Sequence, residues 1–133
     1  MFDAIAIAGS GVTVNRKWLD AVSDNIANIN TVRPTSGDAF RAKYVVATAV
    51  DYGTGTGGTR VAGITLGNPE GRLAYDPTNP LADAEGNVRL PDIDLGSQMT
   101  QMLIAQRAYQ SNLAVVDRAH DAYQAALQLG RNA

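Results

Sequence analysis

SDNIANINT, residues 23–31, ends the first apolar repeat of the chain with three asparagines, Asn25, Asn28 and Asn30. Steps of three and four residues connect this stretch to the apolar residues before it, which is the spacing of one helix face. An asparagine there can donate and accept hydrogen bonds across a contact and so fix its register. It can also end the helix, with Asn28 or Asn30 in the left-handed conformation before Pro34. We expect the three amides to serve both purposes.

The first thirty residues carry two stripes at helical spacing. One stripe has the heptad spacing of a coiled coil and is interrupted only by Asn15. We expect it to pack on the chain's own C-terminal helix, and it contains Ile5, Ala8, Val12, Leu19, Val22, Ile26 and Ile29. The second stripe lies roughly a third of a turn away and carries two of the amides. We expect it to contact a neighbouring subunit, and it contains Ile7, Gly11, Val14, Trp18, Ala21, Asn25 and Asn28.

The C-terminal segment repeats this arrangement. Its apolar seam, interrupted by Gln106 and His120, contains Leu95, Met99, Met102, Tyr109, Leu113, Val116, Tyr123 and Leu127. A stripe of smaller residues nearly opposite the seam includes Ile104 and Val115, which we expect at a subunit interface. A free two-helix hairpin would leave one stripe of each helix in water. The pattern therefore predicts helices that are buried inside a larger helical assembly.

The segment between the helices has a different composition, with all five prolines and most of the glycines. Residues 40–50 and 59–66 are rich in β-branched residues and predict a hairpin joined by DYGTGTGG, residues 51–58. Two further short strands are predicted at GRLAYD and NVRL. Either Asp92 or Asp94, just after Pro91, is expected to cap the second helix.

The predicted fold is mainly α with a small β and irregular insert. The long terminal helices, residues 1–32 and 92–133, are expected to pair as an α-helical coiled-coil hairpin. The insert, residues 33–91, is expected to hold the β-hairpin and extended loops.

Several classes of function are disfavoured by composition. The formal net charge is −2, so the basic surplus that drives nucleic-acid binding is missing. With no cysteine and one histidine, neither a catalytic triad nor a metal site is expected. The glycines at 53, 55 and 58 spell GxGxxG, but a strand follows where a dinucleotide site needs a helix, so no cofactor is expected.

The remaining candidates for chemistry have structural interpretations. The pairs Asp92 with Asp94 and Asp83 with Glu85 could serve acid–base catalysis, but a helix cap and a solvated turn explain them better. His120 lies on the seam, where we expect packing. No small-molecule substrate is expected.

The N-terminal residues lack the basic start of a signal peptide and are too short for a membrane span, so export would use a route without a cleaved signal.

SDNIANINT also resembles the signature that closes the first helix in the axial proteins of the bacterial flagellum, the rod and hook group. YDPTNPLADAEGNVRLPDID and QMLIAQRAYQSNLAVVD resemble the proximal rod members of that group. The most specific run is formed by Asn79, Pro80, Leu81, Ala82 and Asp83. The chain departs from the group's usual residues at Asp24, Asn87 and Gln98.

This resemblance implies a structural subunit of the basal-body rod, the drive shaft that carries torque from the inner-membrane ring to the hook. It implies as partners further copies of the chain, other flagellar rod proteins, inner-membrane ring and rod junction proteins, and the flagellar type III export apparatus. It also implies a location in the periplasmic space, reached without a cleaved signal. The alternatives are another flagellar axial subunit or a free-standing coiled-coil adaptor.

Overall fold

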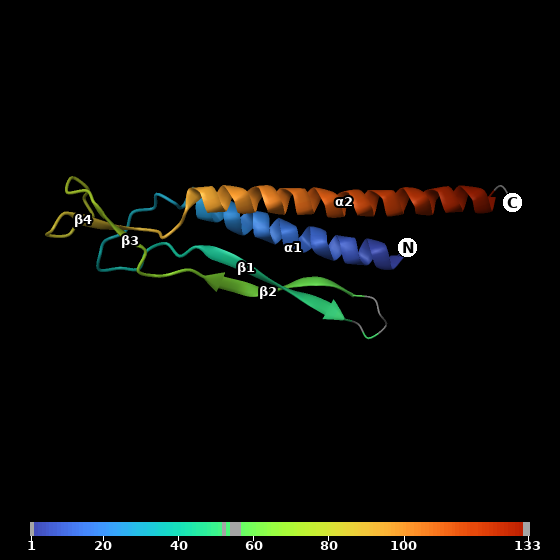
Figure 1. Cartoon of the computed structure of the whole chain (residues 1–133), viewed down its shortest axis with the longest axis horizontal. Helices are drawn as coiled ribbons and strands as arrows, with labels where there is room; N and C mark the ends of the chain where they lie inside the picture. Colours follow the sequence, from blue (N-terminus) through green and yellow to red (C-terminus); the bar gives the residue numbers. More distant parts are fainter. Residues whose placement is uncertain (1, 52, 54–56, 132–133) are drawn as a thin grey trace.

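Two long helices define the shape of the molecule in the computed structural model, which describes residues 2–51, 53 and 57–131. Helix α1 (Phe2–Ala27) and helix α2 (Leu95–Arg131) run antiparallel and side by side (Figure 1). At about 1.5 Å per residue, α2 is about 55 Å long, well beyond the length of an average helix in a globular protein.

The described residues between the helices form four strands: β1 (Lys43–Asp51), β2 (Gly57–Leu66), β3 (Arg72–Tyr75) and β4 (Asn87–Leu90). They confirm the predicted mainly helical fold with a small β insert. They also match the four segments in which strands were predicted.

The hairpin of β1 and β2 lies along α1, on the side away from α2 (Figure 1). Its antiparallel register pairs Val46 with Gly63 and then Ala47 with Val61, so Ala62 is the extra residue of a bulge. In the described part of the chain the hairpin contacts α1 and makes no contact with α2. Much of the predicted connection, residues 52 and 54–56, lies outside the described residues.

The smaller sheet, β3 with β4, fixes the chain that follows α1. Arg33 and Arg89 exchange backbone hydrogen bonds of 2.9 Å in both directions. The Arg89 guanidinium also donates to the carbonyl oxygen of Thr35 at 2.7 Å and to that of Glu70. One arginine thus joins the segment after α1, the segment before β3 and strand β4.

Local hydrogen bonds explain where α2 begins and where α1 ends. Asp94 accepts a 2.7 Å hydrogen bond from the Ser97 amide through Oδ1, which confirms it as the N-cap of α2. The left-handed ending expected at Asn28 or Asn30 is wrong, because only glycines have positive φ among the described residues. The Asn28 side chain instead donates from Nδ2 to the Asp24 carbonyl oxygen at 2.8 Å, a second hydrogen bond to the carbonyl that already accepts from the Asn28 backbone amide at 3.1 Å.

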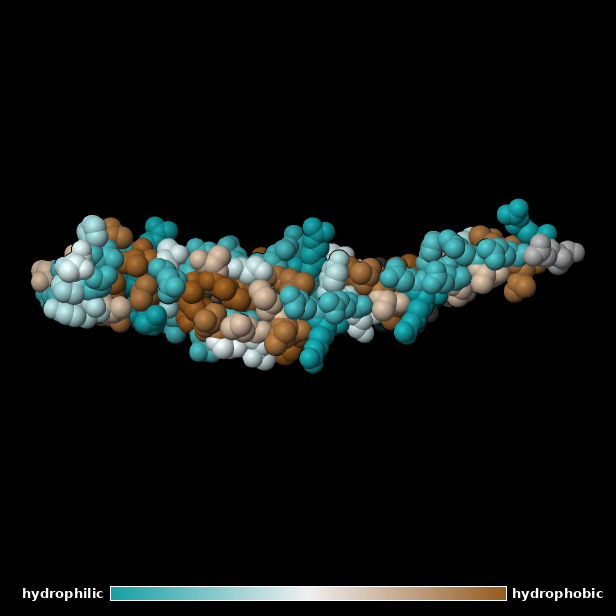
Figure 2. All heavy atoms as spheres, turned by 90° about the horizontal axis from the view of Figure 1, so that it is seen from above, coloured by the Kyte–Doolittle hydropathy of each residue, from teal (hydrophilic) through white to brown (hydrophobic). Residues whose placement is uncertain are grey.

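The apolar core is thin and follows α1, which lies between α2 and the hairpin. Its buried members along the helix contact are small: Ala8, Val14, Ala21 and Val22 of α1 and Ala105 of α2. Further buried apolar residues, Ala39, Ala42, Val88 and Ile93, lie in the segment between the helices. Larger apolar side chains remain exposed on the surface. Seen from the α2 side, Figure 2 shows hydrophobic atoms gathered around the N-terminal part of α2 and hydrophilic atoms more common toward its C-terminal end.

Candidate subunit interface and polar junction

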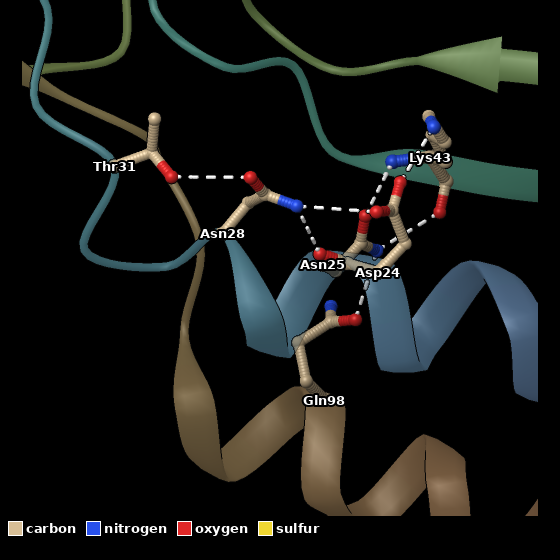
Figure 3. Close-up of polar contacts among 6 residues, drawn as sticks. All are labelled: Asp24, Asn25, Asn28, Thr31, Lys43 and Gln98. Atoms are coloured by element: carbon tan, nitrogen blue, oxygen red, sulfur yellow. Dashed lines mark hydrogen bonds and ion pairs between the residues drawn. The ribbon is translucent and has the colours of Figure 1, made fainter.

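A group of six polar residues joins the end of α1 to the starts of β1 and α2 (Figure 3). We call it the polar junction, and it contains Asp24, Asn25, Asn28, Thr31, Lys43 and Gln98. The amide-rich stretch supplies its centre, and the two other segments supply one residue each.

Asn25 is the centre of the polar junction and is 0% exposed. Its Oδ1 accepts from the Lys43 backbone amide at 2.7 Å, and its Nδ2 donates to the Lys43 carbonyl oxygen at 2.9 Å. The second Nδ2 hydrogen reaches Oε1 of Gln98 at 3.0 Å. The carboxamide therefore pairs with the first residue of β1 as a neighbouring peptide group would, and it also holds α2.

The outer side of the polar junction is more exposed. Lys43 Nζ lies 2.5 Å from Oδ2 of Asp24, with both side chains more than one-third exposed, so the pair contributes at most about 1 kcal/mol. Asn28 Nδ2 donates to Asp24 Oδ1 at 3.1 Å, and Thr31 donates its hydroxyl to Asn28 Oδ1 at 3.1 Å. These contacts close the last turn of α1.

The contact between the two helices is lined by amides and small residues. Trp18 Nε1 donates to Gln101 Oε1 at 3.4 Å. A Cβ added to Gly11 would lie 2.8 Å from Nδ2 of Asn112, so the glycine makes room for that side chain. Gln98 and Ala105 are the buried residues of α2. The line on α2 that faces α1 therefore passes through positions 98, 105 and 112, at heptad spacing.

This line differs from the expected seam on α2. Of the expected residues, the structure leaves Leu95, Met99, Leu113, Tyr123 and Leu127 exposed and half-buries Met102, Tyr109 and Val116. On α1, it buries Ala8 and Val22 and half-buries Ile5, Val12, Leu19, Ile26 and Ile29. Smaller side chains on the contact line let the two helices approach closely. The large apolar residues of α2 therefore lie beside this line and not on it.

The residues expected at a subunit interface differ in how far the chain's own elements cover them. Asn25 and Val14 are covered by the chain's own elements, so neither faces a neighbouring subunit in this structure. The hairpin overlies this face of α1, and cavities between them of about 340 and 500 Å³ are lined by Lys17, Val61 and Ile64 among others. Trp18 and Asn28 are half-buried. Ile7, Ile104 and Val115 are exposed.

The run Asn79–Asp83 lies in the middle of the connection between β3 and β4. Asn79 Nδ2 donates to Asp76 Oδ2 at 3.1 Å. Asp83 Oδ1 accepts from the backbone amides of Asn87 at 2.8 Å and Glu85 at 3.1 Å. The Asn87 amide is the main reason that the pKa of Asp83 lies below its usual value. The Asp83 and Glu85 pair therefore serves a turn.

The other candidates for chemistry are dispersed. His120 is exposed, and its Nε2 lies 3.4 Å from Nε2 of Gln124. Among the described residues, no three acidic, histidine or cysteine side chains form a group that could hold a metal ion. Neither described helix combines the length and apolarity needed to cross a membrane. The polar junction and the close contact of the two helices are features that suit a structural role.

Comparison with known proteins supports this interpretation. A family model described as flagella basal body rod protein matches residues 5–35, and the flagellar basal body rod FlgEFG protein C-terminal model matches residues 84–129. The flagellar basal-body rod protein FlgC of Yersinia enterocolitica is 38% identical over 94% of both chains. The FlgC proteins of Salmonella typhi and Borreliella burgdorferi are 37% and 30% identical over 94% and 97% of both chains.

This chain belongs to the FlgC family of flagellar basal-body rod proteins. Membership confirms the resemblance to the rod and hook group, and with it the expectation of a structural rod subunit of the flagellar basal body. The two matched segments contain most of α1 and most of α2. In this FlgC-family chain the polar junction joins the two matched segments through Asn25 and Gln98.

Proposed function

We propose that this rod subunit polymerises through its terminal helices and transmits torque from the inner-membrane ring to the hook. The observation that carries the proposal is the set of large apolar side chains left exposed on two faces of α2, with Met99 55% and Ile104 51% exposed. Monomeric soluble proteins rarely leave large contiguous apolar patches in water, whereas subunits of an assembly cover them.

The partners in this proposal are further copies of the chain, other rod proteins, inner-membrane ring and rod junction proteins, and the flagellar type III export apparatus. The subunit acts in the periplasmic part of the basal body and reaches it without a cleaved signal. Its role is mechanical and involves no enzymatic activity, cofactor, nucleic acid or small-molecule substrate. The dispersed acidic residues and the exposed His120 support this proposal.

Deletion of the gene from the bacterium that encodes the chain tests the function. Swimming in soft agar should be lost and should return when the gene is supplied again. Purified basal bodies should contain the protein, and its mature mass should include the first residues of the chain. Complete rods in the deletion strain would refute the proposed role, and a shortened mature form would refute export without cleavage.

A further inference from the structure

Helix α2 has three faces, and only one of them contacts α1. At roughly 100° per residue, the contact residues Gln98, Ala105 and Asn112 fall within about 40° of one another. The two remaining faces, one on each side of the contact, carry the exposed apolar residues of the helix. They differ in the charges that accompany these residues.

We call the first of these faces the acidic flank. It lies roughly 60° to 140° around the helix axis from Gln98 and contains Leu95, Met99, Leu113, Asp117 and Asp121, all exposed. We call the second the basic flank. It lies roughly 180° to 260° from Gln98 and contains Ile104, Arg107, Val115 and Arg118, also exposed.

The charges on the two flanks have no ionic partner within the described part of the chain. The ion pair found there joins Lys43 to Asp24, far from the C-terminal half of α2. Asp117 and Asp121 lie four residues apart on one face, where their like charges repel each other. A neighbour that brought a cation to this face would remove that repulsion.

We propose that the acidic flank of one copy packs against the basic flank of a second copy of this chain. This inference rests on the proposed polymerisation and names the partner and the surface. The two flanks are different surfaces of one molecule, so their contact is head-to-tail, and such contacts propagate into open polymers when they do not close a ring.

The positions along the helix agree with this pairing. Arg118 is one residue from Asp117 and three from Asp121, so about 5 Å or less separates their levels along the axis. Val115 is two residues from Leu113, about 3 Å along the axis. Parallel copies with almost no axial offset therefore bring Arg118 near the two acids and Val115 near Leu113 at the same time. At this offset Arg107 faces Gln106 and Gln110, which carry no charge.

Two charge variants and their mixture test the proposal in the deletion strain. Arg118→Asp places an acid on the basic flank at the level of Asp117 and Asp121, and the double change Asp117→Arg with Asp121→Arg places cations on the acidic flank at the level of Arg118. When either variant is expressed alone, like charges face each other between its copies, and it should give at least about tenfold fewer complete rods. Co-expression should restore rods to within about twofold of the wild type, because alternating copies again pair opposite charges. A defect within one chain cannot be repaired by the other chain.

Arg107→Asp is the matched control. It makes the same change of charge on the same flank, but it faces glutamines at this offset, so it should leave rod number within about twofold. Normal rod number in both charge variants would overturn the proposal. So would a mixture that fails although both proteins are exported. If the wild-type gene itself failed to restore rods, the proposed function would fail instead.

Cross-linking gives a second measurement that does not depend on charge. The chain has no cysteine, so Leu113→Cys with Val115→Cys introduces the only thiols. These positions are two residues apart and point roughly 160° apart, so they cannot bond within one chain. Oxidised basal bodies should yield a ladder of cross-linked copies from the double variant and none from either single variant. Monomers from the double variant, or dimers from a single variant, would contradict a head-to-tail contact.

Discussion

Asn25 combines two functions that usually belong to different residues, since it pairs with a strand and joins two helices. Its carboxamide satisfies both backbone groups of Lys43 and also binds Gln98. We therefore expect its loss to damage the fold of one subunit before it damages an assembly.

Asn25→Ala should lower the free energy of unfolding by about 2–4 kcal/mol, because it leaves several buried polar groups without partners at about 1–3 kcal/mol each. Urea titration of the purified chain measures the change. Asn30→Ala, at an exposed asparagine of the same stretch, is the control and should change stability by less than about 0.5 kcal/mol. Equal effects of the two substitutions would show that the polar junction contributes nothing specific.

Asp83 makes the stability of the β3–β4 connection depend on pH. Its folded pKa lies below the usual value of 3.8 because the Asn87 amide stabilises the carboxylate. The stabilisation is therefore complete above the unfolded pKa and is lost as pH falls through the lower folded pKa. Because asparagine does not titrate, the melting temperature of Asp83→Asn should fall less than that of the wild type between about pH 5 and pH 2. Identical melting curves of both proteins across this range would rule out the carboxylate as a contributor.

At the scale of whole elements, α1 is the central layer, and its two glycines differ in their surroundings. A Cβ at Gly9 would meet nothing within 4 Å, whereas one at Gly11 would displace Asn112 of α2. The close approach of the helices therefore depends on one of the two glycines.

Gly9→Ala should stabilise the chain by about 0.5–1 kcal/mol, because alanine favours a helix more than glycine does. Gly11→Ala gains the same propensity but must move Asn112, so we expect no net gain or a loss of up to about 1 kcal/mol. Thermal unfolding followed by circular dichroism measures both. Equal stabilisation by the two substitutions would show that the contact adapts at no cost.

The elements also show how far the sequence alone can predict this fold. The cap at Asp94 and the strands were predictable because local chemistry determines them. The pairing of Asn25 with Lys43 was not, since nothing in the sequence of α1 indicates which strand will lie beside it. The contact line through Gln98 and Asn112 was not predictable from apolar spacing, because amides and small residues form it. Hydrophobic spacing does not distinguish a face buried by the chain itself from one that a neighbour covers.

At the scale of the molecule, α2 extends beyond its partner helix in this structure (Figure 1). Residues 120–131 are all exposed, so a dilute monomer offers this end little burial to offset the backbone ordering of about 1–2 kcal/mol per residue. The ends of the helices should therefore be less stable than the polar junction.

We expect the purified chain to be largely monomeric, with rapid amide exchange over residues 120–131 and slower exchange near Asn25. Sedimentation velocity and hydrogen exchange measure the two properties. Exposed amides should become protected when the chain is incorporated into basal bodies. Strong protection of both helix ends in a dilute monomer would contradict this expectation.

The thin alanine and valine core along α1 has a further consequence for how such a chain would pass through a narrow export channel. A layer with so little apolar area offers weak resistance to a pulling force, so threading the chain requires little mechanical work. On the far side, each docking event would cover the apolar flanks that the single chain leaves bare. We therefore expect the subunit to unfold easily before transit and with difficulty after it has docked. This difference would favour outward transport and growth of the polymer over the reverse process.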